Sequence, residues 1–392
     1  MKILMVSMNN LHFQRWSDQL RDSGHEVFWF DILDQGYAQS LSWMTQITGW
    51  KKRFLKRRGR TFLKTKFPKV YSWLECNYDV RVEDAFERAL LEIQPDVVHS
   101  FALYVAAAPI KNVMQVHAHM KWAYSAWGSD LFYFQHQPNY LADIKQVLQR
   151  VDYLFTDCHR DHQIAVKYGF QGTFLGVFPG GGGYELDNLK QYQLPIKQRK
   201  IIAVKGYQNR SGRAVSVLQA LEMIKDQLTD YEIVVFGADH QDVFRFRAVT
   251  EHGRSEREIP NITIHGKLTH EDIFKLFGKA LLYIGNSNSD GMPNTLLEAI
   301  CCGCHPIQSN PGGATAEIIT DGLNGLLIEN CEDVELIGQV VKKSLTDLDY
   351  LLKSAEYNYI NIVPKLDRDF IKKKVIDAYS ACLPSTGSIF LS

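Results

Sequence analysis

Two acidic residues eight positions apart, Asp290 and Glu298, are the strongest candidates for chemistry in this sequence. Asp290 stands in a polar loop, and Pro293 suits the first position of a predicted helix, so Asp290 lies at the positive end of the helix dipole. Asn294 and Glu298 are four residues apart and share one helical face. The two acids can bracket a polyhydroxyl ligand, while amides of the first turn hold phosphate oxygens. A helix cap and an ordinary surface glutamate are the alternative explanation.

Three basic residues, Lys205, Arg210 and Arg213, form the second candidate group. They lie in the segment KGYQNRSGR, which follows the apolar run IIAV and joins a predicted strand to a predicted helix. Cations on such a loop can neutralise the negative charge that develops on a departing diphosphate. A solvated basic loop that binds no ligand is the alternative.

Short apolar runs alternate with helix-like segments along the whole chain. The predicted strands are residues 2–7, 26–31, 96–101, 121–127 and 152–158, then 200–206, 232–237, 261–266, 281–286 and 304–309. Strands that alternate with helices form parallel βαβ units. Ligands of such sheets bind beyond the carboxyl ends of the strands, and both candidate groups follow a predicted strand.

Four consecutive glycines, residues 180–183, interrupt this alternation directly after Phe178 and Pro179. Such a run marks a boundary between structured parts of a chain. The sequence therefore predicts an α/β protein with two Rossmann-like domains facing each other across a cleft. The predicted parts are a first domain over 1–178, a Gly-rich hinge over 179–198, a second domain over 199–362, and a C-terminal helix and tail over 363–392 that can pack on either domain.

The composition excludes several classes of protein. The 392 residues carry 44 Lys and Arg against 44 Asp and Glu, and this zero net charge argues against a dedicated nucleic-acid-binding protein. The sequence shows no signal peptide and no run of 18 apolar residues, so we expect a cytoplasmic protein. Seven cysteines are typical of reduced thiols, and Cys301-x-x-Cys304, without a second pair, is interpreted as buried thiols. We therefore predict no metal site.

The segment DGMPNTLLEAICCGCHPI, from Asp290 to Ile307, resembles the signature of the large family of retaining GT-B glycosyltransferases, family four or glycosyl transferases group 1. The match extends to the segments 310–313 and 321–326 and to Glu317. The resemblance implies that Asp290, in place of the family's first glutamate, contacts hydroxyls of the donor sugar. It also implies that Glu298 binds the ribose hydroxyls of the nucleotide.

The same resemblance assigns the remaining donor-binding residues of the second domain. It implies that Gly291, Met292, Pro293 and Asn294 line the sugar, and that the amides of Thr295 and Leu296 face the diphosphate. Lys205 and Arg210, with Arg213 close behind, are the residues expected to stabilise the leaving diphosphate. The turn at Gly266 and Lys267 resembles the loop that binds the base, and a plain strand-to-helix turn explains it equally well.

The acceptor side of the cleft is expected in the first domain. In SAWGSDLF, Trp127 stands where the family often has a histidine that touches the donor sugar, and Gly128, Ser129 and Asp130 follow it. Capping of a helix by Ser129 or Asp130 is the alternative. Asn10 follows the first predicted strand and is expected to border the same cleft.

A strongly basic segment, residues 51–69, breaks the overall charge balance. It holds ten Lys and Arg interleaved with Phe and Leu, and no acid occurs from residue 35 to residue 74. Such a segment can lie on an anionic membrane or hold a lipid-linked diphosphate acceptor. A solvated helix or loop that packs its aromatic residues on the first domain is the alternative.

The sequence thus predicts an enzyme that moves a sugar from a nucleotide sugar, a UDP- or GDP-sugar, to a hydroxyl acceptor. By the resemblance the reaction proceeds with retention and without an obligatory metal, and no cofactor beyond the nucleotide-sugar co-substrate is expected. The acceptor is a saccharide, a lipid-linked glycan or a small molecule. A nucleotide-sugar epimerase of the same architecture and a catalytically silent sugar- or membrane-binding module are the alternatives.

Overall fold

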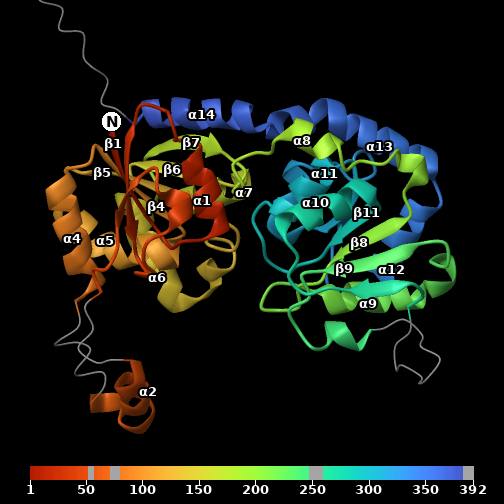
Figure 1. The fold of residues 1–392 in the computed structure, drawn as a ribbon, viewed down its shortest axis with the longest axis horizontal. Helices are drawn as coiled ribbons and strands as arrows, with labels where there is room; N and C mark the ends of the chain where they lie inside the picture. The colour runs from red at the N-terminus through yellow and green to blue at the C-terminus, as the bar shows by residue number, and fades with distance from the viewer. Residues whose placement is uncertain (52–56, 71–79, 247–258, 383–392) are drawn as a thin grey trace, which may run out of the picture. The chain divides into compact units, whose positions relative to one another are not determined.

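The computed structural model describes residues 1–51, 57–70, 80–246 and 259–382, which form two compact units (Figure 1). The first unit contains residues 1–156, 161–178 and the chain from Lys374 onward. The second unit contains residues 157–160 and 179–373. Residues 52–56 of the basic segment lie outside the described residues.

The first unit is built on a parallel sheet of seven strands in the order β3-β2-β1-β4-β5-β6-β7. The strands are β1 (Lys2–Ser7), β2 (Glu26–Asp31), β3 (Thr45–Ile47), β4 (Val97–Phe101), β5 (Lys121–Ala126), β6 (Tyr153–Thr156) and β7 (Thr173–Val177). The helices along this part of the chain are α1 (Leu11–Asp18), α2 (Arg57–Lys66), α4 (Val82–Ile93), α5 (Ala108–Val116), α6 (Pro138–Arg150) and α7 (His159–Lys167), with a short π-helix, η2 (Leu103–Ala107), before α5.

The second unit is built on a parallel sheet of six strands in the order β10-β9-β8-β11-β12-β13. The strands are β8 (Ile201–Lys205), β9 (Glu232–Phe236), β10 (Ile262–Ile264), β11 (Ala280–Gly285), β12 (His305–Ser309) and β13 (Leu326–Ile328). The helices are α8 (Leu186–Lys190), α9 (Ala214–Met223), α10 (His270–Lys279), α11 (Asn294–Cys301), α12 (Val334–Leu345) and α13 (Leu348–Asn361). When the strands of each sheet are counted from its first strand, both orders contain the Rossmann order 3-2-1-4-5-6. In this order strands 2 and 3 lie on one side of strand 1, and strands 4 to 6 lie on the other side.

Apolar runs explain why these segments form the centres of the two units. All residues of β4 and of β11 are buried, which is the pattern of a parallel strand covered by helices on both faces. In the first unit the core includes Leu4, Val98 and Leu154, and in the second it includes Ile202 and Ile284. Figure 1 shows helices on both sides of each sheet.

The predicted α/β class and the predicted strands are confirmed, with most strand bounds within one or two residues. The sequence analysis did not predict β3, β7 and β13. β3 and β13 are only three residues long, which is too short to show a period. β7 contains Gly176 with a positive φ at an irregular register with β6, which weakens its strand-like pattern.

The last helix, α14 (Arg368–Ser380), begins in the second unit and ends in the first. Its residue Tyr379 is fully buried in the first unit, where the hydroxyl lies 2.5 Å from Nδ1 of His99. Burial lowers the pKa of His99 to about 3, so this histidine is neutral and the contact is a neutral hydrogen bond. The predicted C-terminal helix therefore exists, and its end is anchored in the first unit. Within the ranges described, no helix combines the length and the apolar character needed to span a membrane.

Candidate active site

Two loops of the second unit meet at the edge where β8 and β11 end. The amide of Arg213 donates to the carbonyl of Asn286 at 3.0 Å, and the amide of Asn288 donates to the carbonyl of Ser211 at 2.9 Å. Gly212 and Ser287 form a β-bridge between the same loops. Because β8 and β11 flank the point where the strand order reverses, these two loops lie where ligands of such sheets bind.

These loops bring together a cation and an acid that the sequence analysis selected. Lys205 is the last residue of β8, and its Nζ lies 3.9 Å from Oδ2 of Asp290 in the loop after β11. The same Nζ lies 4.9 Å from the centroid of the Tyr207 ring, a cation–π distance. The other carboxylate oxygen of Asp290, Oδ1, accepts from the amide of Gly291 at 3.0 Å.

The segment from Gly291 to Leu296 forms the start of α11. Gly291 has no room for a side chain, since a Cβ there would lie 2.3 Å from the carboxylate of Asp157. Met292 and Pro293 are buried, and α11 begins at Asn294, one residue later than the sequence pattern predicts. The hydroxyl of Thr295 lies 2.9 Å from that of Tyr283. Leu296 is fully buried, and its amide donates to the carbonyl of Pro293 at 3.1 Å.

Glu298, one turn into α11, is a buried carboxylate with a histidine partner. Its residue exposure is 3%, and its Oε1 lies 2.7 Å from Nε2 of His270, the first residue of α10. A carboxylate that is withdrawn from water is unfavourable unless it is paired or hydrogen-bonded, so the His270 contact stabilises it. The sequence analysis did not select His270.

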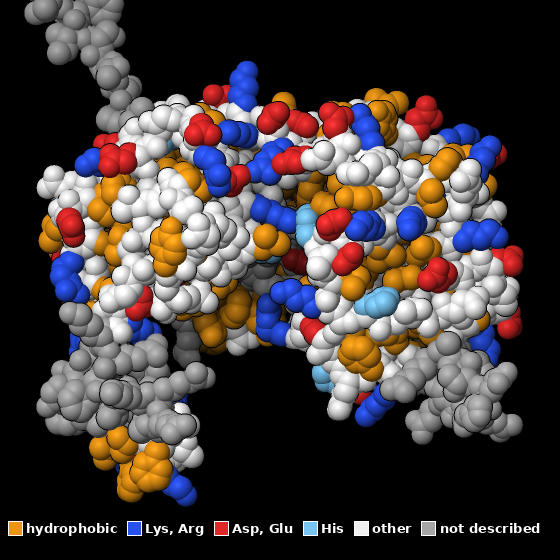
Figure 2. Space-filling view, in the orientation of Figure 1, with side chains coloured by type: hydrophobic (Ala, Val, Ile, Leu, Met, Phe, Trp, Pro, Cys, Tyr) orange, Lys and Arg blue, Asp and Glu red, His pale blue; other side chains and the backbone are white. Residues whose placement is uncertain are grey.

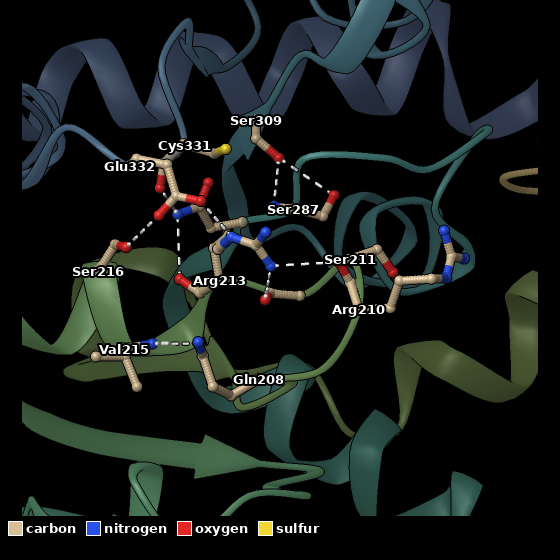
Figure 3. A network of polar contacts seen from close by, with 12 residues as sticks. Gln208, Arg210, Ser211, Arg213, Val215, Ser216, Ser287, Ser309, Cys331 and Glu332 are labelled. Atoms are coloured by element: carbon tan, nitrogen blue, oxygen red, sulfur yellow. Dashed lines mark hydrogen bonds and ion pairs between the residues drawn. The ribbon is translucent and has the colours of Figure 1, made fainter. Parts of the chain in front are cut away.

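The loop after β8 is held by Arg213, as Figure 3 shows. The Nε of Arg213 forms a short ion pair with Glu332, and its Nη1 donates to the carbonyls of Gly212 at 2.8 Å and Asn209 at 3.3 Å. Arg210 is exposed on the same loop, and in Figure 3 its guanidinium points away from the Arg213–Glu332 pair. The sequence analysis placed both arginines at the diphosphate, but the bonds of Arg213 are made to its own loop and to Glu332.

The turn at Gly266 and Lys267 lies beside the end of β9. The amide of Gly237 donates to the carbonyl of Gly266 at 2.9 Å, and Lys267 is exposed. The ring of Tyr207 covers Gly237, where a Cβ would lie 2.8 Å from the ring. Burial raises the pKa of Tyr207, and the carboxylates of Asp239, Glu298 and Asp290 raise it further. Tyr207 therefore lies within the field of both acids that the sequence analysis selected.

In the first unit, the predicted acceptor-side residues lie after β1 and β5. Asn10 caps α1, with its Oδ1 accepting from the amide of Phe13 at 2.8 Å. Trp127 is partly buried, and its ring centroid lies 5.1 Å from that of Phe101 and 6.4 Å from that of His12. Gly128 and Ser129 follow it and are also partly buried, and Gly128 has a φ of 60°.

Asp130 was expected to line the acceptor side of a binding site, but its side chain is buried. It is only 6% exposed, and its Oδ2 accepts from the amide of Leu103 and from the hydroxyl of Tyr124, both at 2.6 Å. Leu103 begins the π-helix after β4, so Asp130 caps a helix other than the one that follows it in sequence. Burial raises the pKa of Asp130 to about 7, against the lowering effect of these two hydrogen bonds.

The comparisons with known proteins identify the second unit. Residues 187–360 match the family model described as glycosyl transferases group 1. The chain carries a group 1 glycosyltransferase domain. The matched residues contain all six strands of the second sheet and every donor-side residue discussed above. A comparison with curated protein sequences gives no match.

Solved structures resemble the fold of this chain over nearly its whole length. Sucrose-phosphate synthase from Thermosynechococcus elongatus is 15% identical, with a TM-score of 0.67 over 97% of this chain and 98% of that chain. The Anabaena protein HepE in complex with UDP-glucose is 12% identical, with a TM-score of 0.68 over 97% and 100%. The α,α-trehalose 6-phosphate synthase from Burkholderia multivorans is 13% identical, with a TM-score of 0.64 over 97% and 96%. At these identities the likeness shows the fold, which is that of the GT-B glycosyltransferases.

Three side chains that the sequence analysis did not weigh as site residues contact predicted site residues or the loop that carries them in this glycosyltransferase. They are Asp157 behind Gly291, His270 beside Glu298, and Asp239, which accepts from the amide of Gln208 at 2.7 Å in the loop after β8. Each is distant in sequence from the residue that it contacts.

Cys301, Cys302 and Cys304 are buried thiols, and burial raises the pKa of Cys304 to about 12, so its thiol stays protonated.

Proposed function

We propose that this glycosyltransferase transfers a sugar from a nucleoside diphosphate sugar to a hydroxyl acceptor with retention at the anomeric carbon. The observation that carries the proposal is the Lys205–Asp290 pair at the edge of the sheet, directly before the N-terminus of α11. The Anabaena protein HepE has been solved with UDP-glucose, which supports a UDP-sugar as the first donor to test. The match to a glycosyltransferase family gives the epimerase and the silent binding module no support.

In this proposal the second unit holds the nucleotide. The first-turn amides of α11 and the positive end of its dipole bind diphosphate oxygens. Lys205 and the exposed Arg210 neutralise the charge that develops on the diphosphate as it leaves. Such electrostatic stabilisation of the transition state is often the largest contribution to catalysis. Glu298 accepts from the ribose hydroxyls, and the Gly266–Lys267 turn contacts the base.

Asp290 and the loop up to Asn294 hold the sugar in this proposal. A carboxylate next to a lysine can accept from sugar hydroxyls while the lysine reaches the adjacent phosphate. The acceptor hydroxyl approaches the face of the anomeric carbon that the diphosphate vacates, through a transition state with oxocarbenium character. Departure of the diphosphate breaks the sugar–oxygen bond, the acceptor oxygen forms the new bond, and a diphosphate oxygen receives the acceptor's proton.

A thermal-shift screen with UDP, GDP and their sugars tests the donor. A ligand that binds the folded protein raises its stability by RT ln(1 + [L]/Kd), about 2.7 kcal/mol at a hundredfold excess over Kd. We expect one nucleotide to raise the melting temperature clearly more than the other. Asp290→Ala and Glu298→Ala should then abolish most sugar transfer. If no nucleotide shifts the melting temperature, or both variants keep full activity, the proposal is wrong.

We also propose that α2 contacts an anionic membrane or lipid-linked acceptor. Among its described side chains Phe62 is 59% exposed, Phe67 directly after the helix is 52% exposed, and Lys64 and Lys66 lie between them. Figure 2 shows hydrophobic side chains on the surface of this segment beside Lys and Arg side chains. The double variant Phe62→Ser, Phe67→Ser should reduce sedimentation with phosphatidylglycerol vesicles. Equal sedimentation of both proteins would contradict the proposal.

A further inference from the structure

We propose that His270 is a positioning residue, which sets the orientation of the Glu298 carboxylate. By this effect it determines how strongly the glycosyltransferase prefers a nucleotide with ribose hydroxyls to one without them. This inference rests on the proposed function, in which Glu298 meets the ribose. His270 itself need not touch the donor in this proposal. Its effect reaches the nucleotide through the 2.7 Å contact between its Nε2 and Oε1 of Glu298.

The structure fixes the imidazole ring of His270 from two directions. Thr269 caps α10 by accepting from the amide of Asp272 at 3.1 Å, so the backbone at His270 has a defined direction. Phe274, one turn later, packs edge-on against the ring with centroids 4.1 Å apart. The His270 side chain is 30% exposed, whereas that of Glu298 is 4% exposed. A ring held on α10 therefore fixes one oxygen of a carboxylate on α11.

The position of the pair along the chain matches the position of a ribose in a nucleotide. His270 begins α10 three residues after Lys267, the end of the turn proposed for the base. Glu298 lies three residues after Thr295, in the turn proposed for the diphosphate. Because the ribose joins the base to the diphosphate, a pair between these two turns is suited to meet the ribose in the proposed arrangement. A buried carboxylate with one oxygen fixed is a directed acceptor, and hydrogen bonds to ionised acceptors are about twice as strong as neutral ones.

A second histidine–glutamate pair in the chain offers a matched control. His117 and Glu87 of the first unit also lie 2.7 Å apart, again Nε2 to Oε1. The Glu87 side chain is 42% exposed, on the surface of α4, and no donor-side residue lies on that helix. Loss of the His117 contact therefore reports what such a pair contributes to stability alone.

The test compares the affinity for UDP with that for 2′,3′-dideoxy-UDP, which lacks both ribose hydroxyls. The dissociation constants are measured by calorimetry for the wild type, His270→Ala, His270→Gln and His117→Ala. We expect the wild type to bind UDP at least tenfold more tightly than the dideoxy nucleotide, as for a charged hydrogen bond. His270→Ala should reduce this ratio about tenfold, His270→Gln should keep part of it because its amide can still donate, and His117→Ala should leave it unchanged.

Two results would overturn the inference while leaving the proposed function intact. One is an unchanged affinity for both nucleotides in both folded His270 variants, which would make the pair a structural tie between α10 and α11. The other is an equal loss of affinity for both nucleotides. Failure of the proposed function looks different, because the wild type would then bind neither UDP nor GDP. If GDP is the nucleotide that binds, the same comparison is made with GDP and 2′,3′-dideoxy-GDP.

Discussion

The sheet of the second unit ends between β8 and β11 in charged loops that are hydrogen-bonded to each other, whereas the sheet of the first unit ends between β1 and β4 among aromatic rings. In the second unit Lys205 and Asp290 face each other at 3.9 Å. In the first unit the Phe101 ring lies 5.1 Å from Trp127 and 6.0 Å from Trp16. Both edges are points where the strand order reverses, so the topology alone does not decide their chemistry.

The difference indicates what each edge is suited to bind. Cations, a helix N-terminus and paired carboxylates suit an anionic, hydroxyl-rich ligand such as a nucleotide sugar. A partly buried tryptophan that packs on other rings presents a rigid apolar face with one polar N–H, which suits the face of a sugar ring. The same strand order thus carries a charged edge suited to the proposed donor in one unit and an aromatic edge suited to the proposed acceptor in the other.

The two edges also differ in how their loops are held. In the first unit Ala102 has a φ of 66°, in the left-handed region that non-glycine residues rarely adopt, and the π-helix starts directly after it. The buried carboxylate of Asp130 holds the first amide of that helix. In the second unit the loop after β8 is held by several hydrogen bonds that involve Arg213, Asn209 and Asp239. A buried carboxylate therefore helps to hold the loop after β4 in the first unit, whereas a network of exposed and partly buried groups holds the loop after β8 in the second.

Removal of the cation at the second edge should produce the largest change. We expect Lys205→Met to lower kcat for sugar transfer by about 100-fold or more, the scale for loss of one stabilising group at a developing charge. The KM for the donor should change less, because the charge develops in the transition state. Lys190→Met, which removes an exposed lysine paired with Asp187 in the same unit, is the control and should keep full activity. A kcat within threefold of the wild type in Lys205→Met would remove the distinction between the two edges.

Removal of the aromatic face at the first edge should separate the two functions. We expect Trp127→Ala to raise the acceptor KM up to about tenfold, since an aromatic stacking contact is worth about 0.5–1.5 kcal/mol. Donor binding in the thermal-shift assay should stay as in the wild type, because Trp127 belongs to the first unit. Trp127→Phe keeps a flat ring and should restore most of the activity. A matched loss of donor binding and transfer in Trp127→Ala would contradict an edge suited to the proposed acceptor.

A smaller effect is expected from the Arg213–Glu332 pair. If Arg213 holds its loop, Arg213→Ala and Glu332→Ala should each weaken UDP binding a few-fold, and the double variant should be no worse than either single variant. The expected loss of affinity is small because an ion pair with a 58% exposed partner contributes at most about 1 kcal/mol. Calorimetry on the four proteins measures this cycle. Tighter binding in Glu332→Ala with a loss above tenfold in Arg213→Ala would instead place Arg213 at the diphosphate.

The order of strands and helices in the sequence allowed the charged edge of the second unit to be predicted. Lys205 and Asp290 were selected in separate segments, and they meet because Lys205 ends and Asp290 follows one of two central parallel strands whose carboxyl ends share one edge. The family resemblance over 290–326 likewise pointed to the matched part of the chain. Such proximity follows from strand order, which a local pattern can reveal.

Contacts that depend on packing between elements could not be predicted in the same way. The His270–Glu298 pair depends on how α10 lies against α11, and the partner of Arg213 is 119 residues away in sequence. Asp130, in a turn of small residues, was expected to line a site, and its burial depends on donors from β5 and from the start of η2. Local propensity carries no information on these distances.

The smallest change in sugar transfer is expected from Asp130→Asn, which should alter the pH dependence of stability instead. The native pKa of about 7 lies above the ordinary value near 4, so the folded protein binds more protons than the unfolded chain between these two values. The contribution of Asp130 to the free energy of unfolding therefore falls as pH rises from about 4 to about 7. Asp130→Asn keeps an acceptor oxygen for Leu103 and Tyr124 but does not titrate.

Chemical denaturation of both proteins at several pH values from 4.5 to 7.5 measures this difference. Relative to the wild type, Asp130→Asn should gain stability across the window, about 3 kcal/mol in total, since each pKa unit between pH 4.5 and the native pKa of about 7 corresponds to about 1.4 kcal/mol. Donor binding at pH 7.5 should be the same in both proteins. Parallel stability curves would show that Asp130 titrates near its ordinary value, which would contradict the buried position that its contacts with Leu103 and Tyr124 indicate.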